Sequence, residues 1–192
     1  VSREDVAKAL DAVTAGKDSF ASIYGRLALR QSELGMPTEA ARACIAAEAS
    51  ARAIDIVKRA SKYLRVQNVS SCISVVKELV TFANSIVGLL SVAEESNKTN
   101  GAVEIVSTYF TGIQDALGKP EPRSMYRLYL SDILANRVVS EKEEEELRRL
   151  RALFGLTETD ALETFKAAAG PLYNKGVSAA LASNSFDDAS KA

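Results

Sequence analysis

Carboxylate side chains gather in one stretch of this chain, residues 139–160, which reads VSEKEEEELRRLRALFGLTETD. Clustered carboxylates are ligands for Ca²⁺ and other hard cations, so a cation site is the first chemistry to consider. A calcium site of this kind also needs a loop of oxygen ligands with a central glycine, and this run has neither. The sequence therefore does not favour a metal site here.

The same stretch carries the signals that begin and end helices. Ser140 with Glu143 forms a capping box, and Gly155 is a typical helix terminator. Thr157 then caps the next helix, with Asp160 at its third position. We interpret the charged run as the solvated face of one helix. Its buried stripe consists of Leu147, Leu150 and Phe154.

Side chains that usually carry enzyme chemistry are scarce. The chain has no histidine, which removes Ser-His and Cys-His pairs and the commonest metal ligand. No isolated pair of acidic residues suggests an enzyme that works with carboxylates alone. We therefore expect no enzyme, no catalytic residue, no metal site and no cofactor.

The only two cysteines are Cys44 and Cys72. Two cysteines exclude a disulfide framework or a four-ligand zinc site within this chain, while one disulfide between them is formally possible. Both stand among small apolar residues on predicted helices, so we interpret them as buried small hydrophobes. Their redox role is left open.

Composition indicates a folded protein with no strong preference for a charged partner. Hydrophobic residues make up 47% of 192, enough to bury a core. The 24 basic and 25 acidic residues give a net charge of -1, which favours neither nucleic acid nor an anionic membrane surface. Because the chain begins at Val1 without a signal-peptide pattern, we interpret it as a fragment or processed product.

Apolar residues recur at spacings of three and four along nearly the whole chain, which predicts seven or eight helices and no strand. The predicted helices cover residues 2–13, 18–34, 38–64, 71–95, 100–117 and 123–136, then the acidic helix and a last helix from Thr157. That last helix should kink or break at Pro171. We expect residues 1–182 to form one helical scaffold segment and residues 183–192 a disordered tail.

Two sequence patterns occur twice. Residues 1–5 resemble residues 139–143, and residues 34–41 resemble residues 154–161. In the second pair a helix ends at glycine, one apolar residue follows, and an acidic helix begins. This echo is either the punctuation that many helical proteins share or a repeated helical hairpin in a solenoid-like stack.

The most apolar stretch, residues 79–93, reads LVTFANSIVGLLSVA and carries no charge. A helix needs about 20 apolar residues to cross a bilayer, and this stretch is shorter. It also contains four polar residues, Thr81, Asn84, Ser85 and Ser91. We favour a buried central helix, and a pore-lining or interfacial helix is the alternative.

The chain resembles a known family over most of its length. The later motifs are Tyr126-Arg127-x-Tyr129-Leu130 after Met125, Ser140-Glu141, Leu147-x-x-Leu150-x-x-x-Phe154-Gly155-Leu156, and Ala161. The earlier segment runs from Cys44-Ile45-Ala46 to Val87. Together they resemble the C-terminal region of the large subunit of the translocon at the inner envelope of chloroplasts (the Tic complex). The departures lie in loops and in the shortness of this chain.

This resemblance implies an all-α protein, an elongated array of helical hairpins like a HEAT solenoid. It implies a stromal-side scaffold of the chloroplast inner envelope that binds precursor proteins with transit peptides and recruits stromal chaperones and co-chaperones. Other translocon subunits are expected partners, nucleic acid is not, and the membrane anchor is expected outside this chain. The alternative is a segment of a cation-selective protein-conducting channel. The resemblance supplies no catalytic residues and does not identify the client-binding residues.

Overall fold

The computed structural model describes residues 2–16, 18–91, 100–135 and 139–182, and all the regular structure in these residues is α-helical. The described helices are α1 (Arg3–Ala15), α2 (Phe20–Glu33), α3 (Thr38–Arg65), α4 (Val69–Ser91), α5 (Asn100–Tyr109), α6 (Glu121–Leu134), α7 (Glu141–Leu153) and α8 (Glu158–Ala182). The all-α prediction is therefore confirmed for the part of the chain that the structure describes.

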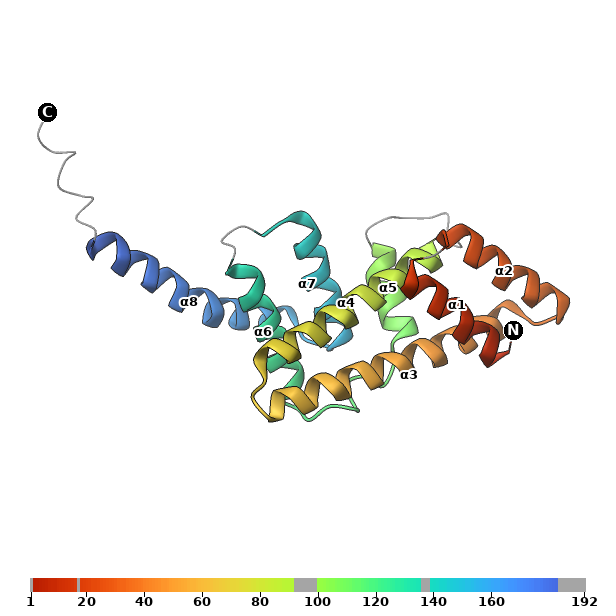
Figure 1. Cartoon of the computed structure of the whole chain (residues 1–192), viewed down its shortest axis with the longest axis horizontal. Helices are drawn as coiled ribbons and strands as arrows, with labels where there is room; N and C mark the ends of the chain where they lie inside the picture. Colours follow the sequence, from red (N-terminus) through yellow and green to blue (C-terminus); the bar gives the residue numbers. More distant parts are fainter. Residues whose placement is uncertain (1, 17, 92–99, 136–138, 183–192) are drawn as a thin grey trace, which may run out of the picture.

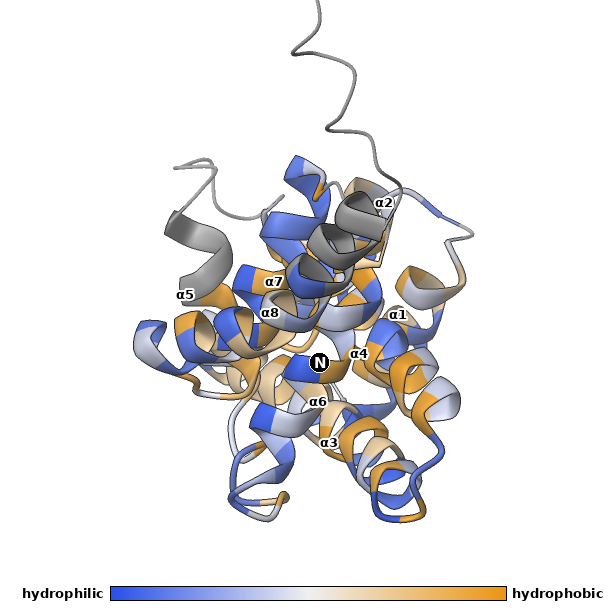
Figure 2. Cartoon of the chain, turned by 90° about the vertical axis from the view of Figure 1, so that its left-hand side faces the viewer, coloured by the Kyte–Doolittle hydropathy of each residue, from blue (hydrophilic) through white to orange (hydrophobic). Residues whose placement is uncertain are grey.

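Helices α3 and α4 form a long antiparallel hairpin at the centre of the molecule (Figure 1). Helices α1 and α2 lie at one end of this hairpin, and α6, α7 and α8 lie toward the other. Helix α4 packs against α1, α2, α3, α5, α6 and α7, and it lies near the middle of the molecule when viewed along the long axis (Figure 2). The favoured prediction of a buried central helix is thus confirmed.

The buried hydrophobic residues form one contiguous core. Helix α4 contributes most to it because its apolar residues point in nearly every direction. Its fully buried side chains include Leu79, Ile86 and Leu89. At roughly 1.5–3 kcal/mol for each large apolar side chain removed from water, burial of α4 contributes strongly to stability.

The helix boundaries read from the sequence hold at the predicted capping residues. Ser140 with Glu143 forms the predicted capping box, and Ser2 with Asp5 forms a second one at the start of α1. Gly155 follows α7 with φ of 60°, in the left-handed region that a glycine adopts without strain. The acidic run therefore forms a capped helix, as interpreted from the sequence, rather than a metal-binding loop.

The prediction that one helix covers residues 100–117 is wrong, because α5 ends at Tyr109. The hydroxyl of Ser50, buried on α3, donates a hydrogen bond to the Tyr109 carbonyl (3.1 Å) and accepts one from the Thr111 amide (2.9 Å). These bonds take up backbone groups that would otherwise continue the helix. Gly112, with φ of 75°, then turns the chain.

Of the predicted kink or break at Pro171, the break is wrong, because α8 continues through this proline to Ala182. Proline removes one backbone donor and leaves the Ala167 carbonyl without its helical partner. Ala167 is exposed, so water can bond that carbonyl. The predicted disordered tail at 183–192 lies outside the described residues, as do residues 92–95 of the predicted fourth helix.

Candidate functional site

A groove runs along the first half of α3, between α2 on one side and α5 on the other. It consists of two adjoining hollows with volumes of about 240 and 440 Å³, and both are lined by Arg42 and Tyr109. We call it the α3 groove. It combines residues from four helices, since Leu90 of α4 also reaches the first hollow.

The floor of the α3 groove is apolar and its rim is polar but carries little net charge. Six buried residues make the floor: Leu27, Ala41, Ile45, Leu90, Ile105 and Tyr109. On the rim, Arg42 lies 3.7 Å from the carboxylate of Glu39, so the two charges offset each other. Exposed Ala28 and Ala43 leave the groove open to solvent. Such a surface suits an apolar or uncharged polypeptide segment.

Hydrogen bonds hold the two walls of the groove in place. On the α2 side, the Gln31 amide donates to the Met36 carbonyl (3.1 Å) and to the Thr38 hydroxyl (3.2 Å), which fixes the corner between α2 and α3. On the α5 side, the bonds of Ser50 tie the end of α5 to α3. The groove walls are therefore set by contacts between helices.

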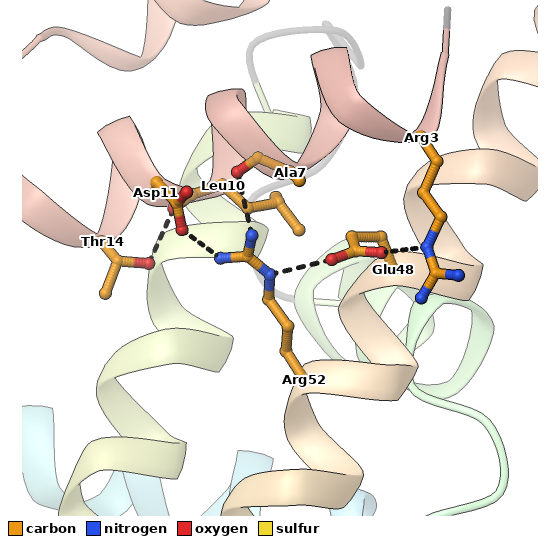
Figure 3. A network of polar contacts seen from close by, with 7 residues as sticks. All are labelled: Arg3, Ala7, Leu10, Asp11, Thr14, Glu48 and Arg52. Carbon is orange, nitrogen blue, oxygen red and sulfur yellow. Dashed lines mark hydrogen bonds and ion pairs between the residues drawn. The ribbon is translucent and has the colours of Figure 1, made fainter.

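A buried carboxylate joins α1 to α3 beside the groove (Figure 3). Glu48, only 9% exposed, accepts hydrogen bonds from Arg3 (2.9 Å) and Arg52 (3.2 Å). Arg52 also donates to the Asp11 carboxylate (2.6 Å) and to the Ala7 carbonyl (3.0 Å) of α1. The hydrogen bond from Arg3, together with Arg52, lowers the pKa of Glu48 although burial opposes this shift.

A second buried carboxylate, Glu121, joins the end of α3 to the start of α6. It accepts hydrogen bonds from Ser61 (2.9 Å), Arg65 (2.7 Å) and the Gly118 amide (2.9 Å). Burial raises the pKa of Glu121, but these three donors outweigh it and the pKa is lowered. Both carboxylates are fully engaged in structure, so neither is a candidate for proton transfer.

The acidic run contributes to a smaller hollow of about 240 Å³ between α4, α6 and α7. Glu143 caps its own helix, and Glu146 accepts a hydrogen bond from Tyr129 (2.8 Å). Burial and this carboxylate raise the pKa of Tyr129. In the part of the chain that the structure describes, no three His, Cys, Asp or Glu side chains are placed to hold a metal ion.

The two cysteines lie far apart. Cys72 is buried near the start of α4, as expected, whereas Cys44 is only partly buried near the start of α3. Because α3 and α4 are antiparallel, Cys44 lies about 30 Å along the helix from the turn beside Cys72, at 1.5 Å per residue. Both thiols are free, and this separation excludes the disulfide that the sequence allowed.

Helix α4 is long and apolar enough to cross a membrane by length and composition, although a core helix of a soluble protein meets the same criterion. In this structure 56% of its apolar window is buried inside the protein. Its polar residues make local contacts: Asn84 accepts a hydrogen bond from Arg149 of α7, and Ser85 bonds the Thr81 carbonyl (2.9 Å). Gly88 lies under the ring of Phe20.

The sequence left the client-binding residues unidentified, and the groove shows why. Its floor residues come from α2, α3, α4 and α5, and each appears in the sequence as an ordinary core position. The many alanines of α3 were a partial indication of the groove, because small side chains let neighbouring segments approach the helix closely. Alanines alone could not reveal which face of α3 stays open.

Comparison with known proteins gives one match. The family model Tic110, described as a chloroplast envelope transporter, matches residues 29–192, more than half of the chain. The matched part includes α3, α4 and α5, which carry most of the α3 groove. No curated protein and no solved structure matches.

Proposed function

Since the chain belongs to the Tic110 family of chloroplast envelope transporters, we propose that it is a scaffold that binds precursor proteins during import into chloroplasts. In this proposal it lies on the stromal side of the inner envelope membrane and recruits stromal chaperones and co-chaperones. Residues 1–182 act as one scaffold segment within the translocon. Membership of this family supports a role in chloroplast envelope transport.

The observation that carries the proposal is the open α3 groove, in which a mostly polar, nearly uncharged lining surrounds an apolar floor. Import requires contact with extended or amphipathic segments of many different sequences, and a groove with an apolar floor and little net charge binds by shape and burial rather than by a specific charge pattern. Exposed Ala28 and Ala43 offer apolar surface, while the exposed Thr108 offers hydrogen bonds at the rim. Such binding would be weak enough to release a client.

The longer-range arrangement in this proposal is a HEAT-like stack of helical hairpins, with α3 and α4 as the central hairpin. The α3–α4 hairpin and the elongated outline support it (Figure 1). In a solenoid each repeat contacts only its neighbours. Helix α4 instead contacts helices on all sides, so this chain would form one block of such a stack.

The groove can be tested by filling it. Ala43 is exposed and lines the groove, while Ala47 is exposed on the same helix and does not line it. We expect Ala43→Trp to reduce binding of a fluorescently labelled precursor at least about tenfold, a change of about 1.4 kcal/mol, and Ala47→Trp to leave it unchanged. The precursor without its transit peptide and a folded control protein are measured alongside.

Equal binding of precursor to both tryptophan variants would remove the groove from the proposal. Negligible binding of every ligand to the unaltered chain, with no chaperone retained from stromal extract, would end the scaffold proposal for this segment. Chaperone retention alone would support recruitment without client binding.

The second candidate function is a segment of a cation-selective protein-conducting channel. It is favoured by one observation, the length and apolar composition of α4. For α4 to enter a bilayer, it would have to leave its packing partners and lose the bond between Asn84 and Arg149. Purification without detergent favours the scaffold, while partition into lipid vesicles with ion conductance favours the channel.

A further inference from the structure

Two helix corners, 120 residues apart in the sequence, have the same backbone structure. After α2, Gly35 has φ of 59°, and after α7, Gly155 has φ of 60°. The Gly35 amide bonds the Ser32 carbonyl at 3.0 Å, and the Gly155 amide bonds the Ala152 carbonyl at 3.1 Å. The next amide in each corner bonds the carbonyl one residue earlier, from Met36 to Gln31 at 3.1 Å and from Leu156 to Arg151 at 3.0 Å. The corner that leads into α8 is therefore equivalent to the corner that leads into α3.

This equivalence shows which face of α8 lacks a covering helix. Ile45 of α3 and Phe165 of α8 both stand ten residues after the glycine of their corner. Ile45 is 7% exposed, in the floor lined by α2, α4 and α5, whereas Phe165 is 45% exposed. On α3, the antiparallel helix α4 supplies most of the cover. Among the described residues, no helix occupies the equivalent position beside α8.

The open face of α8 carries both apolar and charged side chains. Glu158, Leu162 and Lys166 are four residues apart and so lie in one row along the helix, with Phe165 beside them. All four are exposed, and Leu162 is 52% exposed. Among the described helices, α6 is the main neighbour of α8 and it contacts the opposite face, where Thr164 and Ala168 are buried.

We propose that this face binds the same face of a second copy of the chain, with the two α8 helices antiparallel about a two-fold axis at Leu162. Glu158 and Lys166 stand at equal distances before and after Leu162. The two-fold axis therefore brings Glu158 opposite Lys166 of the second copy, and Lys166 opposite its Glu158. Leu162 meets Leu162 of the second copy, and each Phe165 is covered. The row formed by Glu158, Leu162 and Lys166 can therefore pair with an identical row, charge to opposite charge and leucine to leucine. For this reason we propose a second copy of the chain as the partner.

In this dimer, the α8 helix of one copy packs antiparallel against α8 of the other, as α4 packs against α3 within one chain. The hairpin α3–α4 carries a comparable cross-helix ion pair, Arg59 with Glu78, at 2.5 Å. A crossing of two helices buries less than the ~800 Å² per partner of a standard interface, so the dimer is weak and depends on concentration.

Sedimentation of the full 192-residue chain over about two decades of concentration tests the proposal. We expect the apparent mass to rise from the 20.6 kDa of a monomer toward twice that value. Leu162→Asp should hold the mass at the monomer value throughout. Leu29→Asp, at a leucine 62% exposed on α2, is the matched control and should associate like the unaltered chain.

Charge reversal provides the second test, which does not depend on an apolar residue. Lys166→Glu should weaken association, because it places like charges opposite each other twice. The double variant Glu158→Lys with Lys166→Glu restores opposite charges only in an antiparallel pair, so association should return. A mass of 20.6 kDa for the unaltered chain at every concentration overturns the proposal. Equal association of Leu162→Asp, loss of association in Leu29→Asp, or no recovery in the double variant also overturns it.

Discussion

The side-chain amide of Gln114 lies directly over Gly155, so that a Cβ atom added to the glycine would overlap it. Gly155 also has φ of 60°, where a β-branched side chain is strained. We therefore expect Gly155→Val to lower the free energy of unfolding by at least about 1 kcal/mol, measured by urea denaturation.

A substitution at Gly35 distinguishes the backbone strain at Gly155 from the steric overlap with Gln114. It has φ of 59° but no atom within 4 Å of an added Cβ, so Gly35→Val should show the backbone strain alone. Gly155→Val should lower the free energy of unfolding slightly more than Gly35→Val, because the exposed Gln114 side chain must move aside. Adding Gln114→Ala should remove this difference between the two variants. An unchanged midpoint for Gly155→Val would mean that α7 does not end at this glycine.

Protonation of Glu48 should destabilise the protein in acid. Its pKa is lowered in the folded state, so its contribution to stability is present above the unfolded value near 4.5 and is lost as the pH falls below it. Glu48→Gln should cost about 1–3 kcal/mol at neutral pH and flatten the loss of stability below pH 4.5. The exposed Glu39 is the control, since Glu39→Gln should change stability by less than about 0.5 kcal/mol.

Thr81→Lys should discriminate between a core helix and a membrane-spanning helix. Thr81 is exposed on α4 and lines the hollow that contains Asp132, Glu143 and Glu146, so a lysine here should change the free energy of unfolding by less than about 0.5 kcal/mol. In a bilayer-spanning α4, the same lysine would oppose insertion by roughly 2.5–3.5 kcal/mol. Unchanged stability in water supports the scaffold. A selective loss of vesicle binding by the variant would contradict it.

The two thiols should differ in reactivity. Cys72 is buried and burial raises its pKa, which reduces the thiolate fraction, whereas Cys44 is partly exposed. We expect an alkylating reagent to modify Cys44 in the native protein and to reach Cys72 only after unfolding, as measured by mass spectrometry with Cys44→Ala as the control. Equal native labelling of Cys72 would contradict its place in the core.

Local features of the fold could be predicted from the sequence, because helix caps involve residues only three positions apart. Ser140 with Glu143 is an example, and this capping box correctly identified the acidic run as the start of a helix. The end of α5 could not be predicted, because Ser50 acts on Tyr109 from 59 residues away. The α3 groove was missed for the same reason, since only tertiary packing decides that Ala43 is open while Ala41 is covered.

The bond from Ser50 to the end of α5 has a consequence for the order of folding. It joins residues 59 positions apart, whereas the α3–α4 hairpin joins helices that are neighbours in the sequence. Contacts between distant residues cost more loop-closure entropy, so we expect the α3–α4 hairpin to form first and the turn at Gly112 to form later, on α3. Ser50→Ala should therefore slow the late step more than it slows formation of the hairpin, as measured by refolding kinetics.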